Sequence, residues 1–142
     1  CYAYEIRMRL RAHAAFETCQ LQSRKWDVKD LLTDECNTVE GDGVIGEYPM
    51  LQRMSDEEDE AFSRVDSGEV QAAELTAEEG RAYLCAGAKV FTYISQTQFE
   101  SPRGVMSGSF QFVEGSIAEP RSATFDAQVA PFYCCYDPRV VP

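Results

Sequence analysis

The chain has 142 residues, of which 44% are hydrophobic and 11% aromatic, and its net charge is −11. A chain of this size and composition buries a real core, which excludes disorder throughout and predicts a single domain over residues 1–142. Its acidic balance gives poor support to nonspecific nucleic-acid binding by the whole protein, which needs a concentrated basic face, so we expect no nucleic-acid partner. No apolar run approaches the ~20 residues that cross a bilayer, so we also expect no membrane partner.

The amino-terminal third begins with a clear strand pattern. In residues 2–11, large apolar side chains alternate with small or charged ones, which predicts a half-buried strand. Residues 16–21 predict a second short strand or a continuation of the first one after a bend. The mixed spacing in residues 23–32 favours a short helix or turn that packs Trp26 inward, and the glycines and prolines of residues 41–49 predict a loop.

The middle of the chain carries two helix-start signals. Ser55 and Glu58 form the first capping-box pattern, and Thr76 and Glu79 form the second. The contiguous acidic residues 56–60 suit the positive end of a helix dipole better than a calcium loop, which would alternate its ligands with glycine. We expect the first helix to stop at Gly68.

Strand patterns return in the last third, over residues 88–97, 105–113 and 122–136. Short loops between them predict an antiparallel meander that the amino-terminal strand joins. The expected fold class is therefore α+β: an antiparallel sheet of about four strands, covered on one face by helices and loops.

Six cysteines make an even count without the close-spaced pairs of a zinc site. They predict three disulfides and a secreted protein, with no metal or other cofactor. Neighbouring side chains on a strand point to opposite faces, so we expect two different partners for the two adjacent cysteines near the end of the chain. The six positions are Cys1, Cys19, Cys36, Cys85, Cys134 and Cys135.

Charge is distributed unevenly along the chain. Residues 40–79 hold 13 of the 24 acidic residues and two of the 13 basic ones. Arg7, Arg9 and Arg11 form a basic row on one face of the first strand. Two interpretations stay open: this row binds an anionic partner, or the acidic segment folds back and pairs with it.

The cysteine framework, the alternating first strand, and the stretch "SRKWD", in which Arg24 and Lys25 precede Trp26, are similar to secreted effector and avirulence proteins of plant-pathogenic filamentous fungi. The resemblance is to the LARS-fold (Leptosphaeria avirulence and suppressing) family. It implies a four-stranded antiparallel sheet braced by disulfides, no established enzymatic activity, and action in the plant apoplast on a host protein such as an immune receptor. The arginine row and the loops 41–49 and 114–121 are then the candidate contact surfaces.

Two alternatives come from other functional classes. One is a small secreted ribonuclease-like hydrolase in which His13, Glu17 and Arg11 serve as acid, base and phosphate clamp. The other is an extracellular carbohydrate-binding module that uses exposed aromatic side chains such as Tyr93 or Tyr133.

Overall fold

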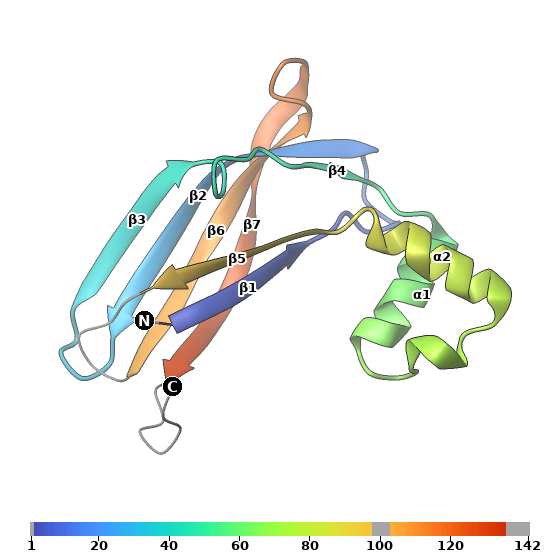
Figure 1. Cartoon of the computed structure of the whole chain (residues 1–142). Coiled ribbons are helices and arrows are strands. Elements are labelled where there is room, and N and C mark those ends of the chain that lie inside the picture. The colour runs from blue at the N-terminus through green and yellow to red at the C-terminus, as the bar shows by residue number, and fades with distance from the viewer. Residues whose placement is uncertain (1, 98–102, 136–142) are drawn as a thin grey trace.

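The computed structural model describes residues 2–97 and 103–135 and contains seven strands and two α-helices within them (Figure 1). The strands are β1 (Tyr2–Met8), β2 (Thr18–Asp30), β3 (Cys36–Asp42), β4 (Met50–Gln52), β5 (Phe91–Thr97), β6 (Arg103–Gly115) and β7 (Pro120–Cys135). The helices are α1 (Asp56–Asp66) and α2 (Ala77–Gly87), with a short 3-10 turn at Ala72–Glu74 between them.

The strands form two sheets that face each other as a sandwich-like fold. One sheet contains only β1 and β5, paired antiparallel; the other has the order β3-β2-β6-β7, and β4 pairs with the beginning of β2. The prediction of one four-stranded sheet is therefore wrong. The meander was predicted from the order of the strands along the chain. β5 and β6 are consecutive but lie in different sheets, so this order predicted the wrong neighbour for β5.

Aromatic side chains fill the space between the sheets. The exposed fraction of Trp26 is 4%, and its ring meets Tyr4 of the facing sheet at 5.7 Å and Phe110 of its own sheet at 5.4 Å, both edge-on. Tyr93 from β5 packs against Tyr4 and Phe110 as well. The inward position of Trp26 was predicted correctly, but it lies on the long strand β2 and not on a helix. Edge-to-face pairs of this kind hold the layers together.

The two helices form a hairpin that projects from one end of the sandwich and does not cover a sheet face (Figure 1). Both predicted capping boxes are present: Ser55 accepts from the Glu58 N–H, and Thr76 accepts from the Glu79 N–H, each with the reciprocal bond. The start sites of both helices are thus confirmed. The prediction that helices cover one face of the sheet is wrong, because the two-stranded sheet of β1 and β5 covers the apolar face of the larger sheet.

The predicted disulfide framework is wrong. Cys19, Cys36, Cys85 and Cys134 are free thiols, whereas three bridges would need all six cysteines. Cys19 and Cys134 are buried as small apolar side chains in the core, and burial raises the pKa of both thiols, that of Cys19 to about 11. The side chains of the other two cysteines lie outside the described part of the structure. The expectation of two different disulfide partners for the adjacent cysteines at the end of β7 is wrong, because Cys134 forms no disulfide.

Candidate functional site

The loop between β3 and β4 contains a tight turn with an unusual residue in it. Val44 and Glu47 exchange two main-chain hydrogen bonds, at 2.9 and 2.7 Å, and the two residues between them have positive φ: 44° at Ile45 and 77° at Gly46. This is the geometry of a type I′ turn, whose first central position favours asparagine, aspartate or glycine. A β-branched isoleucine in the left-handed region is strained, and strain of this kind concentrates at functional sites.

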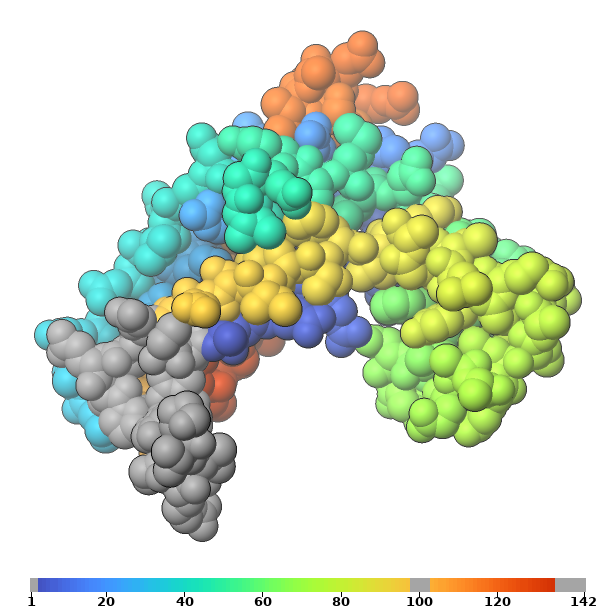
Figure 2. All heavy atoms as spheres, in the orientation of Figure 1, coloured from blue at the N-terminus to red at the C-terminus, as the bar shows by residue number. Residues whose placement is uncertain are grey.

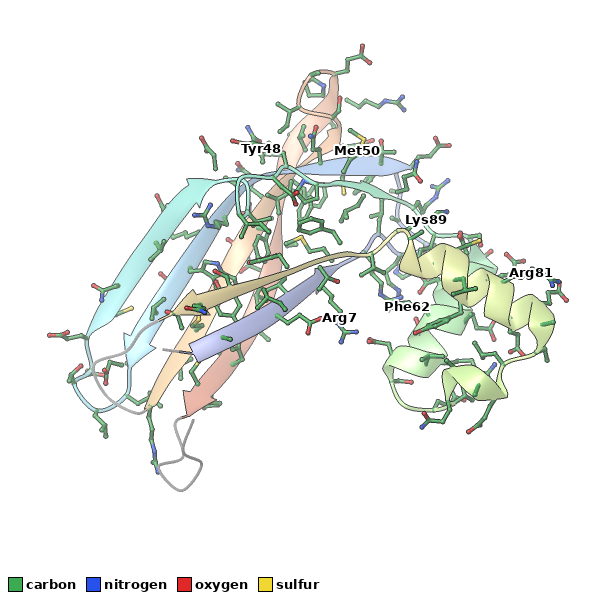
Figure 3. All side chains as sticks on the ribbon, viewed as in Figure 1. Arg7, Tyr48, Met50, Phe62, Arg81 and Lys89 are labelled. Carbon is green, nitrogen blue, oxygen red and sulfur yellow. The ribbon has the colours of Figure 1, made fainter. Side chains whose placement is uncertain are left out.

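Large apolar side chains are exposed along this loop. The exposed fraction is 59% for Ile45, 45% for Tyr48 and 52% for Met50, and Figure 3 shows Tyr48 and Met50 at the rim of the sandwich. The β6–β7 loop adds Ile117, which is 42% exposed. We call these four residues the loop surface. Single exposed apolar residues are common, but a cluster of them marks an interaction site.

One glutamine joins the two loops. The Gln20 side-chain nitrogen donates to the Tyr48 carbonyl oxygen, and its side-chain oxygen accepts from the Ile117 N–H, both at 2.9 Å. Because one amide holds both loops, Tyr48 and Ile117 are fixed on the same end of the sandwich. The loops 41–49 and 114–121, predicted as separate contact surfaces, thus form one.

A groove of about 590 Å³ runs beside the loop surface between β4 and the start of β5. Leu51, which is 4% exposed, and the half-buried Phe91 supply apolar lining, and Glu47 and Lys89 supply the charges. In Figure 2 the green segment that leads into β4 and the yellow start of β5 lie side by side and face the viewer. We call this hollow the β4–β5 groove.

The charges of the β4–β5 groove do not cancel. The Lys89 ammonium bonds the Glu58 carboxylate at 2.9 Å, and this hydrogen bond, with that from the Ser55 N–H, lowers the pKa of Glu58. Glu47 is exposed and has no ion-pair partner among the described residues. The groove therefore presents one uncompensated carboxylate beside an apolar surface.

The predicted arginine row lies against α1. Arg9 and Arg11 both reach the buried Asp59 carboxylate, at 3.0 and 2.9 Å, and Arg7 reaches Asp66 at 3.0 Å. Burial alone would raise the pKa of Asp59, but hydrogen bonds from the Ala12 N–H, Arg11 and Ser63 outweigh it, and the net shift is downward. These contacts match the interpretation in which the acidic segment folds back on the row. Binding of an external partner by these arginines stays a prediction.

A second hollow, of about 620 Å³, opens between β1, β7 and α1. Phe110, Phe112 and Phe125 supply apolar lining, and Glu5, Arg7, Arg9 and Asp66 supply two negative and two positive charges. Because Glu5 and Asp66 both contact Arg7, neither carboxylate of this lining lacks an ion-pair partner.

The residues of the hydrolase alternative are not brought together. His13 and Arg11 line a small hollow over α1, whereas Glu17 lines a different one and reaches Arg53 at 4.0 Å. For the carbohydrate alternative, Tyr133 is 77% exposed but Tyr93 is only 4% exposed. Within residues 2–97 and 103–135 no cluster of potential metal ligands forms, and no helix has the length and apolar character to cross a membrane.

Comparison with known proteins places these observations in context. Residues 1–62 match the ApaG domain. Protein ApaG of Vibrio cholerae is 25% identical over 131 residues, which cover 92% of this chain and 70% of the relative. F-box protein SKIP16 of Arabidopsis thaliana is 28% identical over 137 residues; the chain is matched over 92% of its length but spans only 24% of that relative.

Two solved structures share the fold. A crystal structure of ApaA from Bordetella pertussis has a TM-score of 0.60 at 20% identity and covers 97% of this chain and 76% of its own. An X-ray structure solved as a structural-genomics target has a TM-score of 0.60 at 19% identity and covers 99% of this chain and 74% of its own. At this identity the likeness establishes the fold alone.

These matches correct the resemblance to LARS-fold effectors, since the amino-terminal part matches the ApaG domain and the fold is shared with the Bordetella pertussis ApaA structure. The predicted effector function, which rested on that resemblance, is therefore wrong as well. Neither the hydrolase nor the carbohydrate-binding alternative is supported. Secretion to the apoplast stays untested, and the free cysteines remove the reason for expecting it.

Sequence reasoning found the loop at 41–49 but missed the residues that make it distinctive. The signal for Ile45 and Gly46 was present in "GDGVIGEYP", because closely spaced glycines permit positive φ values. Nothing local indicates that Gln20 joins this loop to Ile117, which lies 97 positions away.

Proposed function

We propose that this chain is an ApaG-type domain that acts as a protein-binding module rather than as an enzyme, and that the loop surface makes the contact. The observation that carries the proposal is the cluster of exposed apolar side chains on two loops held by one amide. Function concentrates on loops that a rigid scaffold positions, and aromatic and methionine side chains are enriched at the centres of protein interfaces.

The architecture of one relative supports the same use. The chain aligns with about a quarter of a protein named as an F-box protein, so in that relative the matching segment is one part of a larger chain. Domains of this kind carry function in sites built on the fold, so binding is inferred from the loop surface itself.

The test is selection from a displayed library of natural protein fragments. Fragments that bind the wild-type chain are remeasured against the separate variants Tyr48→Glu and Met50→Glu, which place a charge in the loop surface. The matched control is Ile94→Glu, because Ile94 is 66% exposed on β5, outside the loop surface.

We expect binding to fall at least tenfold in both loop variants and to stay unchanged in the control, with melting temperatures confirming that all three variants fold. Fragments that bind the loop variants as tightly as the wild type would remove the loop surface from the function. A library that yields no binder would argue against a protein-binding module.

A further inference from the structure

We infer that the partner binds through an extended segment that adds to the free edge of β4, and that this segment carries lysine or arginine between apolar side chains. The inference rests on the proposed function, since it names the chemistry of the partner at the same site. It depends on three features of the β4–β5 groove: a free main-chain edge, an apolar lining and an uncompensated negative charge.

The hydrogen bonds of β4 show which of its main-chain groups are free. Leu21 N–H donates to the Pro49 carbonyl at 3.0 Å, and Arg53 N–H donates to the Glu17 carbonyl at 2.8 Å. In an antiparallel pair, residues that bond the neighbour alternate with residues that face away. The N–H and C=O groups of Met50 and Gln52 therefore point away from β2. At the end of β4 a parallel bridge joins Arg53 to Leu10, and the Met54 N–H donates to the Leu10 carbonyl at 3.1 Å, so the open part of this edge is centred on Met50.

The start of β5 lies across the groove from this edge. Because β5 pairs only with β1, its other side is also free of a strand among the described residues. An added strand beside β4 would extend the larger sheet over the groove. Alternate side chains of that strand would pack inward on Leu51 and Phe91, and the others would lie beside Tyr48 and Met50. We therefore expect apolar side chains at every second position of the partner segment.

The charge of the partner follows from the charges around the groove. Two charged residues line the groove, Glu47 and Lys89. Lys89 is paired with Glu58 at 2.9 Å, whereas Glu47 is exposed and has no ion-pair partner among the described residues. A cationic segment is attracted to this side of the molecule, and an anionic one is repelled. The hollow between β1 and β7 lacks this asymmetry, because both of its carboxylates, those of Glu5 and Asp66, contact Arg7.

The test uses two synthetic ten-residue peptides, one alternating valine with lysine and the other alternating valine with glutamate. Binding to the whole chain is measured by titration calorimetry, and amide exchange at Met50 and Gln52 is followed by NMR. The decisive variant is Met50→Pro, which removes the outward N–H but leaves the residues that bond β2 unchanged. Met50→Leu is its matched control, since it keeps both the N–H and an apolar side chain.

We expect the lysine peptide to bind at least tenfold more tightly than the glutamate peptide, to slow exchange at Gln52, and to lose at least tenfold in affinity in Met50→Pro but not in Met50→Leu. The substitution Glu47→Lys should lower the affinity for the lysine peptide severalfold. Equal binding to wild type and Met50→Pro would show attraction to net charge without strand addition and would overturn the inference. If neither peptide binds while library fragments still lose affinity in Tyr48→Glu, the inferred chemistry of the partner is wrong and the proposed function is not contradicted.

Discussion

Arg9 and Asp59 lie fifty positions apart in the chain, and their side chains meet at 3.0 Å. The Arg9 guanidinium also lies 4.7 Å above the Phe62 ring. The contact joins the segment that follows β1 to the helical hairpin, and Arg11 and the Ala12 N–H bond the same carboxylate. One buried carboxylate, that of Asp59, therefore holds three groups of this segment against the hairpin, and the exposed pair of Arg7 with Asp66 adds a second link.

Replacing Asp59 with asparagine should lower the free energy of unfolding by about 2–3 kcal/mol, because two guanidinium groups lose their shared counter-charge at a site that is largely shielded from water. Urea unfolding measures the change. The matched control is Glu60→Gln, the next residue on the same helix, which is exposed and should change stability by no more than about 0.5 kcal/mol. Equal effects of the two substitutions would show that the Asp59 contacts are not structural.

Acid should weaken this fastening. The pKa values of Glu58 and Asp59 are lowered in the folded chain, so both carboxylates stabilise the fold above their ordinary pKa of about 4 and lose that contribution as the pH falls through the lowered folded values. We expect the urea midpoint to drop between about pH 5 and pH 3. In Asp59→Asn the drop should be smaller, since one of the two groups no longer titrates. Parallel curves for both proteins would contradict the assignment to Asp59.

The thiols offer a direct check on the corrected cysteine chemistry. Alkylation of the unfolded chain without reductant should label Cys19, Cys36, Cys85 and Cys134, as counted by peptide mass spectrometry. In the folded chain the exposed Cys36 and Cys85 should react first. With a pKa of about 11, Cys19 is a thiolate in only about one molecule per thousand at pH 8, and burial blocks access as well. Label that enters these four positions only after reduction would restore the disulfide hypothesis.

The sequence predicted features that depend on local chemistry. Capping boxes at Ser55 and Thr76 and the alternation of the first strand are set within a few residues, and the structure has both. Pairing of β1 with β5 joins Met8 to Phe91 across most of the chain, and no local pattern reports such a partner. The cysteine count misled because a small buried thiol such as Cys19 packs like any apolar side chain.

In the candidate site, too, local features could be predicted from the sequence and contacts between distant segments could not. A loop at 41–49 was predictable from its glycines, and its use as a contact surface was a reasonable expectation. The groove beside it exists only because β4 and β5, from different sheets, end up next to each other. Three residues of β4 are too few for a periodic pattern, so neither the strand nor its free edge could be read from the sequence.

Replacing Ile45 should raise the stability of the fold and weaken the binding of partner fragments. Asparagine tolerates positive φ better than isoleucine, so Ile45→Asn should raise the free energy of unfolding by about 1 kcal/mol by relieving strain in the type I′ turn. The same substitution removes an apolar side chain that is 59% exposed on the loop surface, so it should weaken fragment binding. Urea unfolding and the fragment-binding assay, run on the same preparation, measure the two effects.

The matched control is Val39→Asn, which makes a comparable change at an exposed β-branched residue of β3 without a positive φ. It should destabilise slightly, because asparagine fits a strand less well than valine, and it should leave binding unchanged. A gain in stability at Ile45 without any loss of binding would place the strained residue outside the contact. A loss of stability would mean that the isoleucine side chain stabilises the loop by more than its backbone strain costs.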